Sequence, residues 1–272
     1  MANQAVRTRV ASNDQVSAML WNSSVAYILA DMVVIVLHES AHTVAGLVQG
    51  YRATQFTGEV RFTPGQTTTA LVITALAGPL FSLVSGLLAM TFHPFRRHGF
   101  AHLLWIWIAF LSAEEGFGYL TIAPFITAGD TGAALSALKA PGWVGWICSA
   151  VGIAGLVFLA RQFALRGVRH TRDLYEIRAF CFYPWLIGTG VSMALVGAYL
   201  AFTPATSSSA VIAIMVGTAS FGVFAPMAMI FWQKVQATKH LLELGTPRAG
   251  IAAAVALALG NLLVLARGVH FG

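Results

Sequence analysis

Two histidines and a glutamate in an apolar segment have the spacing of a metal-dependent hydrolase centre. Residues 38 to 42 are His-Glu-Ser-Ala-His, an HExxH pattern. Side chains four residues apart lie on one face of a helix, so His38 and His42 can present both imidazoles to a single metal ion. Glu39 lies beside them, where its carboxylate can remove a proton from a metal-activated water. The pattern predicts a zinc centre with Glu39 as the general base.

The apolar surroundings of this motif favour a functional role. An ionisable side chain at the centre of a membrane helix costs about 2.5 to 3.5 kcal/mol on insertion scales, and such residues usually face the protein interior and serve a function. The alternative is that the three side chains only form hydrogen bonds between helices. Asp31 lies on nearly the same helical face as His38. It either orients that histidine as an outer carboxylate or lies at the entry of the helix, facing the membrane interface.

A third protein ligand must come from elsewhere in the chain. A catalytic zinc ion takes three protein ligands and keeps its fourth position for water. The acidic candidates at membrane depth are Glu114, Glu115 and Asp130. Asp130 stands in Thr-Ala-Gly-Asp-Thr-Gly, whose glycines would let the backbone open and deliver the carboxylate to a neighbouring helix. Spacing alone leaves these three residues about equally good.

The composition indicates that these residues are embedded in a lipid bilayer. Hydrophobic residues make up 57% of the chain and charged residues only 10%, whereas soluble domains are about a quarter charged. Apolar segments long enough to cross a hydrocarbon core of about 30 Å follow one another along the chain. They cover residues 23–48, 70–91, 101–127, 142–160, 179–202, 208–232 and 249–267. We expect an all-α integral membrane protein with about seven transmembrane helices, six to eight.

Two features modify this simple arrangement. Glu114 and Glu115, with the glycines that follow them, could break the third segment into two half-helices. Residues 53–64 have β-branched and aromatic side chains around a glycine, a pattern that predicts a short β-hairpin between the first two helices. The expected organisation is a polar N-terminal segment (1–22), a three-helix core with the metal-site residues (23–140) and a four-helix C-terminal membrane region of unassigned role (141–272).

The basic residues indicate orientation and not nucleic-acid binding. The net charge is +6, but the Lys and Arg residues stand in short segments between apolar stretches. If every segment spans, twelve of the sixteen fall on the side of the N-terminus, which favours a cytoplasmic N-terminus. The first apolar segment is too long for a signal-peptide core. We therefore expect an integral protein of a bacterial cytoplasmic membrane, and no nucleic-acid partner.

Three motifs stand together in the first half of the chain. They are His38-Glu39-Ser40-Ala41-His42 followed by Gly46 and Gly50, then Ala75-Leu76-Ala77-Gly78-Pro79-Leu80, then Gly129-Asp130. Over roughly residues 24–135 they resemble the metal helix, the Ala-Gly-Pro segment and the Asp-Gly motif of the site-2 protease family of intramembrane zinc metalloproteases. The resemblance implies a metalloendopeptidase that cuts a substrate protein in or near a membrane-spanning segment. It also implies that Asp130 is the third zinc ligand.

The resemblance also assigns roles around the metal. Gly78, Pro79 and Ser82 would contact the substrate or pack the helices, although Ser82 stands where many family members have an asparagine. Gly46 and Gly50 form a GxxxG pattern that would let helices approach closely. A transmembrane substrate must unwind before it can be cut, and the predicted hairpin offers an edge strand that could hold the unwound segment.

Two other functions fit parts of the pattern. A membrane di-iron hydroxylase would use His38-x3-His42 and His98-x3-His102, but such enzymes need more histidines. His93, His98 and His102 beside Arg96 and Arg97 are more simply a basic interfacial loop. A non-catalytic membrane protein that binds a metal or client proteins would need the ligands but not the base Glu39. The oligomeric state is left open by the sequence.

Overall fold

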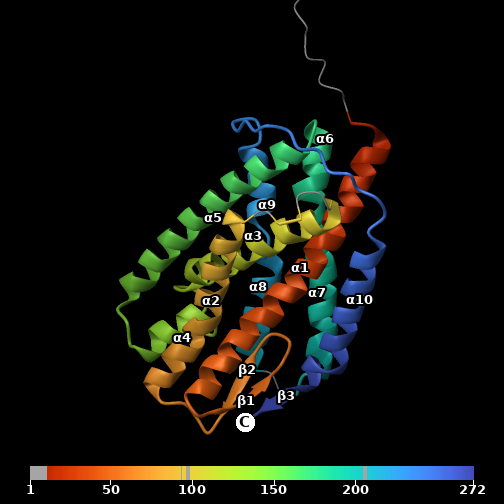
Figure 1. Cartoon of the computed structure of the whole chain (residues 1–272). Helices are drawn as coiled ribbons and strands as arrows, with labels where there is room; N and C mark the ends of the chain where they lie inside the picture. The colour runs from red at the N-terminus through yellow and green to blue at the C-terminus, as the bar shows by residue number, and fades with distance from the viewer. Residues whose placement is uncertain (1–10, 93, 96–98, 205–206) are drawn as a thin grey trace, which may run out of the picture.

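The computed structural model is a bundle of long helices with a small sheet at one end (Figure 1). It describes residues 11–92, 94–95, 99–204 and 207–272. The helices are α1 (Asn13–Val48), α2 (Thr68–Thr91), α3 (Gly99–Ile122), α4 (Asp130–Ala137), α5 (Gly142–His170), α6 (Leu174–Ile177), α7 (Tyr183–Phe202), α8 (Ser208–Ser220), α9 (Phe224–Met227) and α10 (Arg248–Leu263). A π-helical turn (Arg178–Phe182) joins α6 to α7. The strands are β1 (Arg52–Gln55), β2 (Val60–Thr63) and β3 (Val269–Phe271).

Seven stretches of the described chain are long and apolar enough to cross a membrane. They are α1, α2, α3, α5, Leu174–Phe202, Ser208–Ile230 and Arg248–Arg267, one for each predicted segment. The prediction of an all-α membrane protein with seven spans is therefore confirmed. The first helix begins earlier than expected, at Asn13, because Ser12 and Gln15 form a capping box around its first turn.

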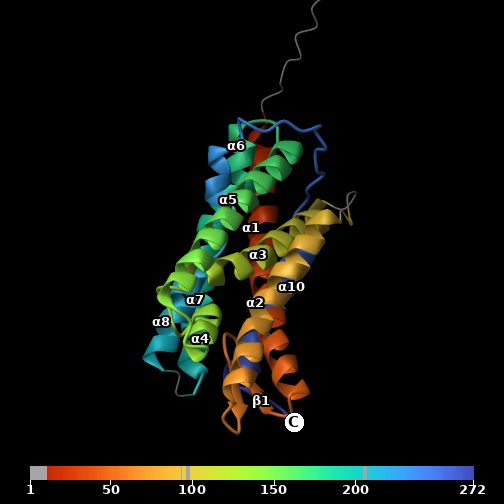
Figure 2. The ribbon, with the colours of Figure 1, turned by 90° about the vertical axis from the view of Figure 1, so that its left-hand side faces the viewer.

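The tilted helix α1 runs through the bundle and packs against α2, α3, α7 and α10 (Figure 2). Where it crosses α3 and α5, the core is a cluster of interlocked aromatic rings. Trp107 of α3 lies edge-on to Tyr27 of α1, with ring centroids 5.0 Å apart, and 4.8 Å from Phe163 of α5. The Trp107 indole donates a hydrogen bond to Ser23, so its polar atom is satisfied inside the bundle. This cluster fixes α3 against α1.

A helix break lies in the sixth span and not in the third. Helix α3 continues through Glu114 and Glu115, so the predicted alternative of two half-helices there is wrong. Instead α8 ends at Ser220, and Gly222 adopts a φ of 78° before α9 begins. Glycine tolerates this left-handed conformation because it has no Cβ.

The backbone at this break is fully engaged by neighbouring helices. The Glu114 carboxylate of α3 accepts hydrogen bonds from the backbone N–H groups of Gly222, at 2.5 Å, and Val223, at 2.9 Å. The Phe221 carbonyl accepts from the Tyr27 hydroxyl at 3.0 Å and from the Trp185 indole at 3.2 Å. Open backbone is tolerated at membrane depth only where such partners replace water. Glu114 therefore has a structural role that its sequence position did not indicate.

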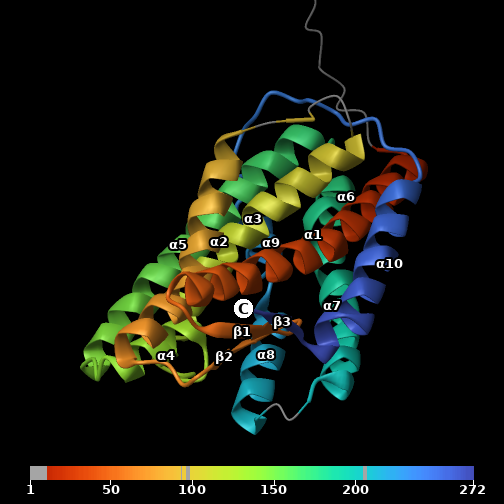
Figure 3. The same ribbon diagram turned by 60° about the horizontal axis from the view of Figure 1, so that its bottom comes forward.

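The sheet has the order β2-β1-β3, with β1 antiparallel to both neighbours. The predicted hairpin is present as β1 and β2, whereas β3 was not predicted. The Gln55 side chain of β1 ties the sheet to α1, because it accepts a hydrogen bond from Thr43 at 3.0 Å and donates one to Ser40 at 3.3 Å. Within the described residues β2 pairs with β1 alone, so its outer edge is open. The sheet lies between α1 and α8 (Figure 3).

Candidate metal centre

Helices α1 and α4 bring three potential metal ligands together. His38 Nε2 lies 3.0 Å from His42 Nε2 and 3.0 Å from Asp130 Oδ2, and His42 Nε2 lies 3.1 Å from the same oxygen. These residues are the one group of this kind in the part of the chain that the structure describes. Around a tetrahedral zinc ion with bonds of about 2.0 to 2.1 Å, neighbouring ligand atoms are ~3.3 Å apart. The three atoms are therefore close to the spacing that one zinc ion requires.

The hydrogen bonds of the imidazoles leave their inner nitrogens for a cation. His42 Nδ1 lies 2.6 Å from the backbone carbonyl of Thr74. A carbonyl can only accept, so neutral His42 carries its proton on Nδ1 and directs the lone pair of Nε2 at Asp130. His42 Nε2 and the Asp130 carboxylate are then two acceptors 3.1 Å apart. Two such atoms face each other stably only with a proton or a metal ion between them, so the donor set fits a metal.

Gly78 of α2 makes the space in which the two imidazoles meet. An ideal Cβ at this position would lie 2.3 Å from His42 Nε2 and 2.7 Å from His38 Nε2. Helix α2 can lie this close to α1 only because residue 78 has no side chain. Gly78 is therefore a neighbour of the candidate ligands and does more than pack helices.

Two further residues of the Ala-Gly-Pro region contact different partners. Ser82, one turn after Gly78, places its hydroxyl 3.2 Å from His38 Nδ1. Pro79 lies inside α2, where its carbonyl would be 2.8 Å from a Cβ added to Gly116 of α3. Ser82 thus touches a candidate ligand, and Pro79 lies at the close crossing of α2 and α3.

Asp130 is delivered by a short helix of its own. It is the first residue of α4, which follows the third span. One oxygen of its carboxylate, Oδ2, faces Nε2 of both histidines, at 3.0 Å and 3.1 Å. This is the position from which a carboxylate can share a metal ion with the two imidazoles.

The two glutamates of α3 that were equal candidates lie elsewhere. Glu114 holds the break in the sixth span. The Glu115 carboxylate lies 3.8 Å from Nδ1 of His38, the ring nitrogen that does not face Asp130. Neither belongs to the three-residue group.

Glu39 lies on a cavity next to the candidate ligands. The cavity has a volume of about 460 Å³ and is also lined by His42 and Asp130. One wall is the β1–β2 hairpin, including Val60 and Phe62, and the opposite walls come from α3, α7 and α8. Glu39 is buried, with an exposed fraction of 6%. A carboxylate in this position can reach a water or a peptide held in the cavity.

The GxxxG pattern after the histidines has a different use from the one predicted. A Cβ added to Gly46 would lie 2.1 Å from the ring of Phe62, so this glycine makes room for β2 and not for a helix. Gly50 follows the end of α1 with a φ of 85° and would meet nothing within 4 Å. These two glycines shape the exit from α1 into the sheet.

The remaining polar candidates lie apart from the centre. Asp31 accepts a hydrogen bond from the Ser192 hydroxyl of α7, so its described partner is not His38. His102 is buried within α3 and not in an interfacial loop, and its Nε2 lies 3.3 Å from Nε2 of His170. At 1.5 Å per residue it is ~20 Å along α3 from Glu115, which lies beside His38. His93, Arg96, Arg97 and His98 lie outside the described residues.

The centre has to be interpreted from its own geometry. No protein-family model, no curated protein and no solved structure matches the chain. The arrangement shows an integral membrane protein in which two imidazoles and a carboxylate converge beside a buried glutamate on a cavity.

Proposed function

We propose that the chain is an intramembrane zinc metallopeptidase of the site-2 protease type. It would hydrolyse a peptide bond in or near a membrane-spanning segment of a substrate protein. The observation that carries this proposal is the convergence of His38, His42 and Asp130 within 3.1 Å of one another, with Glu39 on the adjoining cavity. Two histidines and a carboxylate are a known ligand set of catalytic zinc, with one position left for water. The resemblance of the sequence motifs points the same way.

The residues of the chain then have separate roles in the reaction. When bound, zinc lowers the pKa of a water molecule and polarises a carbonyl. Glu39 takes the proton of the attacking water and returns it to the amine that leaves. The Thr74 carbonyl fixes the tautomer of His42, and the Ser82 hydroxyl contacts Nδ1 of His38 and can orient that ring. The buried position of Glu39 keeps bulk water away from this proton transfer.

The hairpin is suited to present the substrate. A peptide bond inside a transmembrane helix is hidden by hydrogen bonds of the helix, so the segment must be extended before it is cut. The outer edge of β2 is unpaired among the described residues, and its Val60 and Phe62 line the cavity. An extended substrate segment that adds to this edge would gain backbone hydrogen bonds next to Glu39.

The proposed setting is a bacterial cytoplasmic membrane with the N-terminus in the cytoplasm. The distribution of Lys and Arg between the spans supports this orientation. Reporter fusions after Val48 and after Thr91 test it, since they should report opposite sides. A cytoplasmic signal from the fusion after Val48 would show that the protein has the opposite orientation.

The experiment that tests the function measures zinc and cleavage in the same samples. The parent protein is purified in detergent beside His42→Ala, Asp130→Ala and Glu39→Gln, with exposed His240→Ala as the control. We expect His42→Ala and Asp130→Ala to lose zinc, and Glu39→Gln to keep zinc but lose cleavage of a transmembrane substrate. The control should match the parent in both measurements.

Other results would point to another function. A parent protein without zinc contradicts the proposal, and iron in its place would favour the hydroxylase alternative. If zinc is bound but Glu39→Gln cuts as well as the parent, Glu39 is not the base. If zinc is bound and no substrate is cut, the chain is better described as a membrane protein that binds metal or client proteins.

A further inference from the structure

The cavity beside the metal centre is strongly acidic for a basic chain. The whole chain has a net charge of +6, with ten Asp and Glu residues. Six of these ten line the cavity: Asp31, Glu39, Glu59, Glu114, Glu115 and Asp130. None of the described Lys and Arg residues lines it. The cavity therefore concentrates acidic side chains at one place in the membrane region.

Three of the six carboxyl groups have basic or backbone partners among the described residues, and Glu39 has the proposed role of general base. The three are Asp130 beside the histidines, Glu59 beside Arg61, and Glu114 at the break in the sixth span. Asp31 and Glu115 remain, and neither has a basic side chain other than a histidine near it among the described contacts. These two residues are therefore the ones that can serve a ligand.

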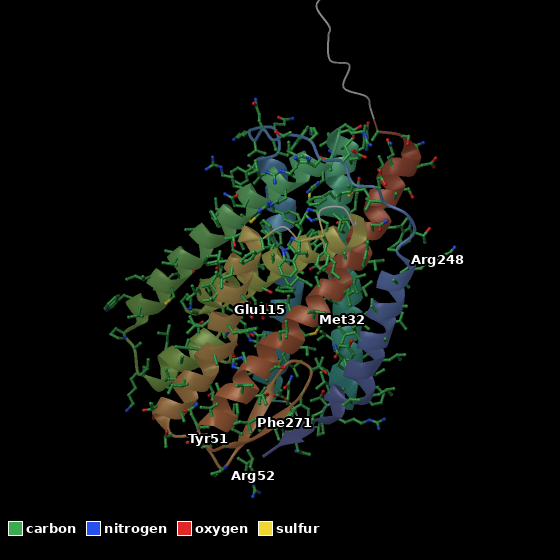
Figure 4. The ribbon with its side chains drawn as sticks, in the orientation of Figure 1. Met32, Tyr51, Arg52, Glu115, Arg248 and Phe271 are labelled. Atoms are coloured by element: carbon green, nitrogen blue, oxygen red, sulfur yellow. The ribbon has the colours of Figure 1, made fainter. Side chains whose placement is uncertain are left out.

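Glu115 has no hydrogen-bond partner among the described residues. Its exposed fraction is 8%, and the closest polar group is His38 Nδ1 at 3.8 Å, beyond hydrogen-bond distance. The residue lies in the middle of the bundle and lines the cavity, whereas Arg52 and Phe271 mark the sheet end of the molecule (Figure 4). A buried carboxyl group without a partner takes up a proton unless a cation or a hydrogen-bond donor beside it favours the ionised form. A group that enters the cavity can be that partner.

Asp31 lines the same cavity. It accepts one hydrogen bond, from Ser192, and its two oxygens can accept more. Tyr199 and Asn261 line the cavity as well. Asp31 precedes His38 by seven residues on α1, which places it ~10 Å from the metal centre along the helix axis. An extended peptide covers this distance in about three residues, at about 3.3 Å per residue.

We propose that the cavity binds a Lys or Arg side chain of the membrane-spanning substrate between Asp31 and Glu115, along the stretch that leads from Asp31 to the metal centre. The inference rests on the proposed peptidase function and adds a rule for where it cuts: within about three residues of a basic residue. A second metal ion is a poorer occupant, because the described residues hold three close ligands only at His38, His42 and Asp130. A cavity of about 460 Å³ is large enough for a long side chain. A basic side chain is costly in lipid, so acidic partners would favour such segments over apolar ones.

The test compares two membrane-spanning peptides of about 20 residues that differ only in one central residue, Lys or Gln. Binding is measured by fluorescence anisotropy in detergent, with Glu39→Gln protein so that neither peptide is cut. We expect the Lys peptide to bind roughly tenfold more tightly. Adding Asp31→Asn or Glu115→Gln to this protein should reduce the preference to less than about twofold, because each removes one of the two carboxyl groups that would pair with the ammonium group of the lysine. Exposed Asp14→Asn, the same substitution on the same helix outside the cavity, should leave the preference unchanged.

The two substitutions are chosen to preserve the fold. An asparagine at position 31 can still accept from Ser192, and Glu115→Gln breaks no hydrogen bond of the described residues. Equal binding of the two peptides, binding of neither, or a preference that survives both substitutions would overturn the proposal. The outcome is separate from that of the peptidase proposal, because binding is read without cleavage. Zinc and cleavage without charge preference would refute this inference alone, whereas charge preference without zinc would leave a membrane protein that binds basic segments.

Discussion

Replacing Gly78 by alanine places a methyl group against both histidines of the metal centre. The new Cβ would lie 2.3 Å from His42 Nε2, whereas ordinary contact begins at 3.4 Å. The imidazole must therefore move back by about 1 Å, but metal–ligand distances tolerate deviations of only about 0.2 Å. We expect zinc affinity to fall by about 100-fold or more, at least the loss that follows when outer partners of a zinc ligand are removed. Overpacking should also cost about 1 to 3 kcal/mol of stability.

Zinc affinity of this variant is measured by competition with a chelator, and its fold by circular dichroism. The matched control is Gly197→Ala in α7, where an added Cβ would meet nothing within 4 Å. It should bind zinc as the parent does and unfold at the same or a slightly higher temperature. If Gly78→Ala stays folded and binds zinc within about twofold of the parent, α2 does not lie against the histidines as described, and the geometry of the site is wrong.

Three further predictions concern the surroundings of the centre. Gly46→Ala should displace β2 and reduce cleavage, because its Cβ would lie 2.1 Å from the Phe62 ring. Adding Phe62→Ala should restore part of the lost cleavage, whereas strictly additive losses would contradict the contact. Glu114→Ala leaves the N–H of Gly222 and a neighbouring N–H without their acceptor. The free energy of unfolding, measured by thermal unfolding in detergent, should fall by about 2 to 3 kcal/mol. An unchanged melting temperature would refute the structural role of Glu114. Zinc at 100 times its Kd should raise the free energy of unfolding of the parent by ~2.7 kcal/mol. A chelator should reverse this stabilisation, and His42→Ala should abolish it. Stabilisation by zinc that persists in His42→Ala would place the zinc elsewhere.

The seven spans could be predicted because hydropathy is a local property. Every apolar segment became a membrane-length helical stretch, with a break in the sixth, and the β-branched residues around Gly58 did form a hairpin. The helix break could not be placed, because it depends on a partner far away in the chain. Glu114 is separated by 108 residues from Gly222, whose backbone it holds. The third strand could not be predicted for the same reason, because Val269–Phe271 pairs with β1, which is far away in the sequence.

The site could be predicted only in part. Helical spacing alone places His38 and His42 on one face, and Gly129-Asp130 was chosen over the α3 glutamates through a family resemblance. That Asp130 meets the two histidines depends on the path of a short helix that no local pattern reveals. The contact between Ser82 and His38 was also missed. The sequence did show a small polar residue one turn after Gly78. Only the packing of α2 on α1 shows that this residue contacts a histidine.

The central claim is that one zinc ion is held by His38, His42 and Asp130. X-ray absorption at the zinc edge tests it most directly, on protein loaded with one zinc ion per chain. The account predicts two imidazole nitrogens and oxygen ligands at about 2.0 to 2.1 Å, with one imidazole lost in His42→Ala. Failure to load, a sulfur ligand at about 2.3 Å, or a spectrum unchanged by His42→Ala would contradict it.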